Sequence, residues 1–334
     1  MKKMEYEILK DYSRGSDDRT ILCSGSTGLF FRKIATGKKN ISKLRNQVDW
    51  IQNYSNKISL PCIDNIYVSE LEMFYDMRFN KGKTFSEFIC ENNNAKQNIS
   101  ILGSILNDLE NNLYFSNLQQ KKSGNQLEKY IQEKIIDNYN SMIANKQFSD
   151  ILRYDYVTIN GVYYPNIHMY DSIFKKSNLY NVFINDRCGE IHGDLTLENI
   201  IISSDEGEKY YLIDPNTNNN FHSVYLDYAK VLQSLHGKYE LIRKKNSKVI
   251  VDKNNIIISY EKNASYDKMY LLYRQLLDSK FNYDQQKSIY YHEIVHWLRL
   301  YKYRNKHEPD KILLYYAVFL KILKDVYEMF EEEK

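Results

Sequence analysis

Short runs of alternating apolar and polar residues mark the first 80 positions of the chain, and longer runs with helical spacing mark most of the remaining positions. Alternation with a period of two is typical of strands. Strands are therefore predicted at residues 6–10, 19–23, 29–35, 61–71 and 73–79. A helix is predicted between the third and fourth of these, because Leu44, Val48 and Ile51 recur at helical spacing. It should span residues 42–53, with Ser42 capping its first turn.

Apolar residues three and four positions apart recur from residue 100 to residue 144 and again in the last third of the chain. This spacing gathers them on one face of a helix. Helices are predicted at residues 100–144, with a break at 121–125, and at residues 171–183, 266–277, 285–303 and 310–331. Two hairpins are predicted at residues 154–164, around Asn160-Gly161, and at residues 248–260, around Asn254-Asn255. The second part of the chain should thus be mainly helical.

Composition narrows the class of protein. A chain of 334 residues is long enough for a large core or for two lobes. A net charge of +3 gives no strong attraction to nucleic acid. The N-terminus turns acidic where a signal peptide would turn apolar, and no run approaches 18 apolar residues, so neither an export signal nor a membrane span is predicted. Scattered cysteines without paired spacing suit a reducing, cytoplasmic location: Cys23, Cys62, Cys90 and Cys188.

One stretch combines charged residues with short β-branched runs. Residues 200–202 and 211–213 are predicted to form two short strands, and Asp194, Asn199 and Asp214 would project from their ends into one space. Two carboxylates and an amide oxygen suit a hard divalent cation, which prefers oxygen ligands. One of the carboxylates could instead accept a proton from a hydroxyl group.

Two motifs define this stretch, HGDLTLEN at residues 192–199 and IDP at residues 213–215. Together they resemble the catalytic core of aminoglycoside phosphotransferases, choline kinases and their relatives, which share the protein-kinase-like fold. The variant looks most like kinase-like proteins found in bacterial capsule and surface-polysaccharide gene sets. Gly193 and Thr196 stand where protein kinases usually carry arginine and lysine, which favours the small-molecule branch.

The resemblance implies a bilobal α+β architecture. A small antiparallel β-sheet lobe, residues 1–80, would bind the nucleotide, and a larger, mainly helical lobe, residues 81–334, would carry the catalytic and substrate residues. ATP would lie between the lobes. The resemblance implies a dependence on both ATP and Mg²⁺.

The same resemblance assigns roles to single residues. Asp194 corresponds to the catalytic base, while Asn199 and Asp214 correspond to the residues that hold magnesium at the ATP phosphates. Lys33 stands where the family's phosphate-binding lysine stands, on the third predicted strand. Arg32 is the residue that a one-residue slip would select instead, because alternation flips the faces of a strand.

Two further segments are expected to meet the nucleotide. Gly15 and Ser16 lie between the first two predicted strands, where the resemblance places the loop that covers the phosphates. An ordinary turn is the alternative for these two residues. Met77 and Phe79 belong to the stretch that fits the linker between the lobes, where backbone groups meet adenine.

Gln47 is the clearest departure from the family pattern. The family places a glutamate on this helix to pair with the strand lysine, and glutamine can hydrogen-bond a lysine but cannot neutralise it. Three other residues have two possible roles each. Asp227 and His192 are expected to brace the catalytic loop, and His236 to pack or cap a helix, with a substrate contact as the alternative.

A rival motif, H-E-x-x-H, occurs at residues 292–296 and matches the zinc-protease signature. It lies in a predicted helix, so both histidines would share a face. A third ligand is missing, because the position six residues after His296 is Lys302. We therefore expect a packing helix rather than a zinc site.

The expected activity is transfer of the ATP γ-phosphate to a hydroxyl of a small molecule. A sugar or polyol precursor of surface polysaccharide is the first expectation for the acceptor, and an aminoglycoside or choline-like amine is the second. The alternative is a nucleotide-binding pseudokinase that acts as a regulatory or scaffold module, with Gln47 as its only support. A protein-kinase role is disfavoured by Gly193 and Thr196.

Overall fold

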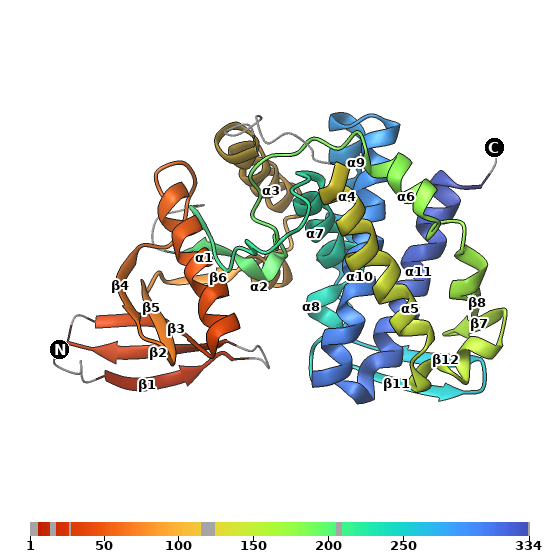
Figure 1. Cartoon of the computed structure of the whole chain (residues 1–334), viewed down its shortest axis with the longest axis horizontal. Helices are drawn as coiled ribbons and strands as arrows, with labels where there is room; N and C mark the ends of the chain where they lie inside the picture. The colour runs from red at the N-terminus through yellow and green to blue at the C-terminus, as the bar shows by residue number, and fades with distance from the viewer. Residues whose placement is uncertain (1–5, 14–17, 27, 115–123, 205–208, 333–334) are drawn as a thin grey trace.

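The chain forms two lobes of different character, seen side by side in Figure 1. The structure is a computed structural model that describes residues 6–13, 18–26, 28–114, 124–204 and 209–332. Gly15 and Ser16 lie outside the described residues. A five-stranded antiparallel sheet with one long helix makes the first lobe, and helices make most of the second. The expected α+β class and two-lobe arrangement are confirmed.

Strands make up most of the first lobe, and helices dominate the second. The strands are β1 (Tyr6–Asp11), β2 (Arg19–Gly25), β3 (Gly28–Thr36), β4 (Ile63–Val68), β5 (Glu72–Arg78), β6 (Gly82–Thr84), β7 (Tyr156–Ile159), β8 (Val162–Pro165), β9 (Ile200–Ser203), β10 (Tyr210–Leu212), β11 (Lys248–Asp252) and β12 (Asn255–Ser259). The α-helices are α1 (Lys38–Tyr54), α2 (Phe85–Glu91), α3 (Ala95–Leu109), α4 (Gly124–Tyr130), α5 (Asp137–Ile143), α6 (Lys176–Phe183), α7 (Tyr225–Leu235), α8 (Tyr239–Ile242), α9 (Ala264–Lys280), α10 (Tyr283–His307) and α11 (Ile312–Phe330). Two π-helical segments are η1 (Glu110–Tyr114) and η2 (Ile131–Ile136), and the 3-10 turns are η3 (Lys146–Phe148), η4 (Ile151–Arg153), η5 (Ile167–Tyr170), η6 (Leu197–Asn199) and η7 (Pro309–Lys311).

The sheet of the first lobe has the order β1-β2-β3-β5-β4, and α1 packs against β3 and β5. Leu44, Val48 and Ile51 are buried on the helix face that meets the sheet, as their spacing predicted. The helix begins earlier than predicted, at Lys38. Gly37, with φ of 81°, reverses the chain after β3 in a conformation that suits glycine, so Ser42 lies inside the helix and the prediction of its capping role was wrong.

The connection between the lobes is short and closely packed. Along the chain, β5 is the last strand that joins the sheet of the first lobe, whereas β6 pairs with β9 in the second lobe. A Cβ added at Gly82 would lie 2.5 Å from the Ile202 carbonyl oxygen, so only glycine fits at this crossing. Thr84 then caps α2 through a capping box with Glu87. The chain therefore enters the helical lobe through a fixed crossing beside the predicted catalytic stretch.

Helices α7 and α10 form the centre of the second lobe. Helix α10 contacts α5, α6, α7, α11 and η2, and both helices are buried over most of their length. The predicted long helical stretch at residues 100–144 is divided into α3, η1, α4, η2 and α5. Within the described residues, no helix is both long enough and apolar enough to cross a membrane.

The two predicted hairpins join into one four-stranded sheet of order β11-β12-β7-β8. Strands β12 and β7 pair in parallel, with Asn255 opposite Thr158 and Ile256 opposite Ile159. The first hairpin turns at Asn160-Gly161, as predicted, with positive φ at both residues. The second turns one residue earlier than predicted, since Lys253 has the positive φ and Asn255 already belongs to β12.

Candidate active site

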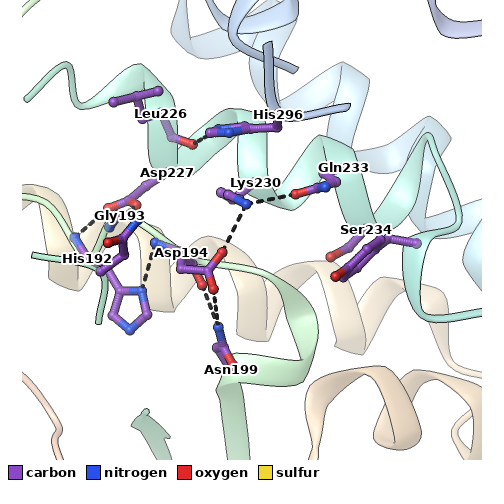
Figure 2. A network of polar contacts seen from close by, with 12 residues as sticks. His192, Gly193, Asp194, Asn199, Leu226, Asp227, Lys230, Gln233, Ser234 and His296 are labelled. Atoms are coloured by element: carbon purple, nitrogen blue, oxygen red, sulfur yellow. Dashed lines mark hydrogen bonds and ion pairs between the residues drawn. The ribbon is translucent and has the colours of Figure 1, made fainter. Parts of the chain in front are cut away.

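The loop between α6 and β9 holds Asp194 and Asn199 together. The side-chain nitrogen of Asn199 donates to the backbone carbonyl of Asp194 at 2.8 Å and to Asp194 Oδ2 at 3.1 Å, as Figure 2 shows. The turn η6 ends at Asn199 and brings it back to Asp194. With its nitrogen used in this way, Asn199 retains an amide oxygen as a possible cation ligand. The Asp194 side chain is 37% exposed, so a substrate can reach it.

Asp214 lies beside this loop because β9 and β10 are neighbours in one sheet. The backbone nitrogen of Ile213 donates to the Asn199 carbonyl at 3.0 Å, which ties the two segments together. Asp214 has φ of 57°, a left-handed conformation that aspartate tolerates better than most residues. Its Oδ1 lies 2.7 Å from Lys33 Nζ on β3, so a single ion pair joins the two lobes at this point.

The structure places Lys33 and Arg32 on opposite faces of β3. Lys33 points toward Asp214, whereas Arg32 makes a buried bidentate ion pair with Asp76 at 2.7 and 2.8 Å. Both side chains are almost fully buried, so neither is an ordinary surface cation. The geometry therefore selects Lys33 as the residue of β3 that faces the site.

Gln47 lies close to Asp214 but has different partners from those expected. Its side-chain nitrogen donates to the Pro215 carbonyl at 2.9 Å, and its oxygen accepts a hydrogen bond from Tyr75 at 3.1 Å. Lys33 finds its counter-charge in Asp214 instead. Gln47 thus anchors α1 to the segment that carries Asp214, a contact that a neutral amide makes well and an unpaired buried carboxylate would not.

Asp227, on α7, holds the start of the loop that carries Asp194. Its carboxylate accepts hydrogen bonds from the backbone nitrogens of His192 at 2.8 Å and Gly193 at 2.7 Å (Figure 2). It also accepts one from the Tyr114 hydroxyl at 3.1 Å. Gly193 has φ of 78°, and a Cβ there would lie 2.4 Å from the Asn216 carbonyl oxygen. The motif therefore needs glycine at this position for both its conformation and its space.

His192 is fully buried and links the two loops. Its Nε2 donates to the Ile213 carbonyl at 2.9 Å, and the backbone nitrogen of Asp194 donates to its Nδ1 at 3.4 Å. Burial lowers the pKa of His192, so the ring remains neutral with one nitrogen as donor and the other as acceptor. These contacts hold the Asp194 and Ile213 segments together, which agrees with the expectation that His192 braces the loop.

His236 lies elsewhere, at the far end of α7. Nine residues separate it from Asp227, or about 13 Å along the helix axis. Its two ring nitrogens donate to Glu293 at 2.9 Å and Asp325 at 3.0 Å, and its ring stacks on Tyr270. Burial alone would lower the pKa of His236, but the two carboxylates outweigh it and raise the pKa to about 9. A packed, charged histidine fits these contacts better than a substrate ligand.

Comparison with known proteins identifies the fold of this chain. No protein-family profile matches the chain, and no curated protein sequence matches it. Solved structures match over nearly its whole length. The apo form of a thermostable mutant of aminoglycoside phosphotransferase APH(4)-Ia has a TM-score of 0.61 at 9% identity, covering 96% of this chain and 95% of that chain. The chain has the protein-kinase-like fold.

Two further structures with this protein-kinase-like fold extend the comparison. The gentamicin complex of APH(2'')-IIa has a TM-score of 0.53 at 12% identity and covers 96% of this chain and 92% of its own. ADP-bound aminoglycoside phosphotransferase APH(2'')-Ib has a TM-score of 0.53 at 13% identity, with 98% and 95% covered. Identities this low establish the shared fold alone.

The H-E-x-x-H motif lies on α10, at the centre of the helical lobe of the protein-kinase-like fold. His292 accepts a hydrogen bond from Tyr130 at Nδ1 and donates to Asp186 from Nε2, both at 2.8 Å. His296 donates to the Leu226 carbonyl at 3.1 Å. The two histidines therefore reach different elements. Over the described part of the chain, no group of three or more His, Cys, Asp or Glu residues could hold a metal ion.

Lys230 is a site residue that the sequence reasoning missed. It lies one turn after Asp227 on α7, and its ammonium is 2.9 Å from Asp194 Oδ1 and 3.0 Å from Gln233 Oε1 (Figure 2). Thr196 stands where protein kinases place a lysine in the loop itself, so the cation beside the carboxylate comes from another element of the fold. The only sequence signal was the spacing of Asp227 and Lys230, which puts both on one helix face.

The Lys230 ammonium changes the acidity of Asp194. Burial alone would raise the pKa of this carboxyl, but the ammonium outweighs it and holds the pKa below its usual value. Replacing Lys230 with methionine should therefore raise the pKa of Asp194, and the acid limb of any pH–rate profile should move to higher pH. Lys230→Arg retains the charge and should keep the pKa low.

Carbon-13 NMR titration of the aspartate carboxyls measures the pKa of Asp194 without a substrate. The Asp194 signal is identified by its absence in Asp194→Asn. An Asp194 titration that is the same in wild type and in Lys230→Met would show that the ion pair has no influence on the carboxyl.

Proposed function

We propose that this protein is an ATP-dependent phosphotransferase that transfers the γ-phosphate to a hydroxyl of a small molecule. One observation carries the proposal: Asp194, Asn199, Asp214 and Lys33 meet where the two lobes join, linked by the hydrogen bonds and ion pairs described above. A base, two oxygen ligands and a phosphate-binding cation are the parts that phosphoryl transfer to an alcohol requires.

In this proposal Asp194 accepts the proton of the acceptor hydroxyl. The hydroxyl oxygen forms a bond to the γ-phosphorus while the bond from that phosphorus to the bridging oxygen of ADP breaks. Lys230 keeps Asp194 ionised, and Asn199 fixes the orientation of its carboxylate. Since phosphoryl transfer depends on positioning and charge stabilisation more than on covalent chemistry, holding one carboxylate in one orientation is a direct contribution to the rate.

The residues fit a magnesium ion. The Asn199 amide oxygen and the half-exposed Asp214 carboxylate are hard oxygen donors, and Mg²⁺ characteristically takes one or two protein ligands together with water and phosphate oxygens. When bound there, it would neutralise charge on the ATP phosphates. Lys33 would bind the α- and β-phosphates, because its ammonium already lies next to Asp214.

For adenine, we propose the segment after β5. Phe79 stacks on Phe31 of β3 with ring centroids 5.7 Å apart, and Met77 is buried on β5. These side chains form an apolar surface at the inner edge of the sheet, which suits the flat face of a base. We also propose that the two lobes comprise residues 1–80 and 81–334. A cytoplasmic location is proposed as well.

A sugar or polyol precursor of surface polysaccharide is the proposed acceptor, on the resemblance of the HGDLTLEN motif. An aminoglycoside is the second candidate, because the solved structures with the same fold include aminoglycoside phosphotransferases. The pseudokinase alternative loses its support from Gln47, since that residue has a structural partner in the Pro215 carbonyl.

Thermal melting followed by a substrate screen tests the proposal. ATP should raise the melting temperature with Mg²⁺ and much less without it. The protein should then be incubated with Mg·ATP and a panel of sugars, polyols, aminoglycosides and choline, with mass spectrometry to detect an added phosphate. Equal ATP stabilisation with and without Mg²⁺ would contradict the nucleotide site, and binding without transfer to any compound would favour the pseudokinase.

A further inference from the structure

Three helices bring cations together beside the proposed base. Tyr130, at the end of α4, contacts His292 of α10, and Leu226 of α7 contacts His296 one turn further along α10. Figure 1 shows α4, α7 and α10 lying together in the second lobe. The next turn of each element carries a cation, and these three residues are Lys134 on η2, Lys230 on α7 and Arg299 on α10.

Among the residues that the structure describes, only one of these cations forms an ion pair. Lys230 pairs with Asp194, whereas Lys134 and Arg299 form no ion pair with any residue that the structure describes. Glu133, next to Lys134, pairs with Lys129 at 3.8 Å and accepts a hydrogen bond from Asn220. Both unpaired cations are only partly exposed, so water does not fully screen them.

The charges influence one another. Burial lowers the pKa of Lys134, the nearby charge of Arg299 lowers it further, and the charge of Glu133 opposes them only in part. Arg299 also contributes to lowering the pKa of Asp194, behind the larger effect of Lys230, and that of buried His296. Like charges held close without an ion-pair partner are unfavourable for folding, and such an arrangement is commonly kept where an anion binds. The position of Lys134 on a π-helical segment agrees with this, since these segments are frequent at functional sites.

We propose that Arg299 and Lys134 bind an anionic group, a phosphate or a carboxylate, carried by the same acceptor molecule that presents its hydroxyl to Asp194. The inference rests on the proposed function and names the class of its substrate: a polyol or sugar that already bears a negative charge. The planar guanidinium of Arg299 can hold a phosphate or carboxylate through two parallel hydrogen bonds, while Lys134 supplies a point charge.

The same cations disfavour the second candidate for the acceptor. An aminoglycoside carries several ammonium groups, and placing one beside Arg299 and Lys134 would bring like charges together. The cost would be greatest close to Asp194, where Lys230 already occupies the carboxylate. Arg299 and Lys134 therefore favour anionic acceptors in two ways, because they attract an anionic group and repel an ammonium group.

Binding of three matched compounds tests the inference without turnover. Glucose, glucose 6-phosphate and glucuronate share a sugar ring. Glucose is uncharged, glucose 6-phosphate carries a phosphate and glucuronate carries a carboxylate, so the series also shows which of the two anionic groups is bound. Each is titrated by calorimetry at constant ionic strength, with the nucleotide site filled by Mg·AMP-PNP and again without nucleotide. At least one anionic compound should bind about tenfold more tightly than glucose, because charge-assisted hydrogen bonds form only with the anion.

Arg299→Gln and Lys134→Gln should each reduce this preference, and the double variant should abolish it. Arg45→Gln is the matched control, an exposed helical arginine on α1 in the other lobe, and it should leave the preference unchanged. Circular dichroism and melting temperature show whether each variant is folded.

Equal binding of glucose and both anions, no binding of either anion, or a preference that survives the double variant would overturn the inference. Failure of Mg·AMP-PNP to bind would instead count against the proposed function, while the titrations without nucleotide still report on Arg299 and Lys134.

Discussion

Replacing Asp194 with asparagine should lower phosphoryl transfer by about 10² to 10⁴-fold, the usual contribution of a positioned base, and leave Mg·ATP affinity within a few-fold of wild type. Asparagine retains the shape of the side chain and one acceptor oxygen for Asn199. It loses the basic oxygen that takes the hydroxyl proton and the charge that pairs with Lys230. The variant therefore isolates the chemical step from nucleotide binding.

Initial rates at saturating ATP, together with calorimetric titration of Mg·ATP, measure the two quantities separately. Asp49→Asn is a suitable control, since Asp49 is an exposed carboxylate on α1. If a substrate is found and Asp194→Asn turns it over at the wild-type rate, the assignment of the base is wrong. If nucleotide affinity falls as much as the rate, Asp194 would act in binding rather than as a base.

Asp214→Ala should abolish the magnesium-dependent part of ATP binding and with it most of the turnover. At a ligand concentration of 100 times Kd, binding stabilises the folded state by about 2.7 kcal/mol, and this gain should disappear from the melting curves of the variant. Removing Asp214 also removes the counter-charge of Lys33, so a second variant is needed to separate the two effects.

Lys33→Met provides that separation. If Asp214 acts only through Lys33, both variants should lose the same ATP stabilisation whether magnesium is present or not. If Asp214 holds the metal, Lys33→Met should retain a difference between melting with and without magnesium, and Asp214→Ala should show none. A magnesium-dependent shift that persists in Asp214→Ala would mean that other residues hold the ion.

The sequence was most informative where contacts are local. Asp194 and Asn199 are five residues apart in one loop, and Asp214 follows β10, which pairs with the preceding strand β9, so the motif spacing was enough to predict that they meet. Alternation and helical spacing likewise predicted the first sheet and α1. The start of α1 was predicted wrongly because two turn signals compete there, and the positive φ of Gly37 prevailed over the capping potential of Ser42.

The residues that sequence reasoning missed depend on tertiary packing. Lys230, Lys134 and Arg299 come from three helices that are distant in sequence, and nothing in the local pattern shows which way their side chains point. The partner of Gln47 is the Pro215 carbonyl, 168 residues away, and no motif records such a contact. Helix propensity and periodicity describe a single element, whereas these contacts are decided by how elements cross.

The parallel pairing of β12 with β7 has a consequence for how the chain folds during synthesis. Val157 and Ile159 of β7 are fully buried in the complete fold and lie next to β12, whose residues follow about 100 positions later. At ribosomal rates of about 5–20 residues per second, the first hairpin would wait roughly 5–20 seconds with these side chains uncovered. Until β12 is made, the buried side chains of this hairpin therefore remain open to contact with chaperones or with other chains.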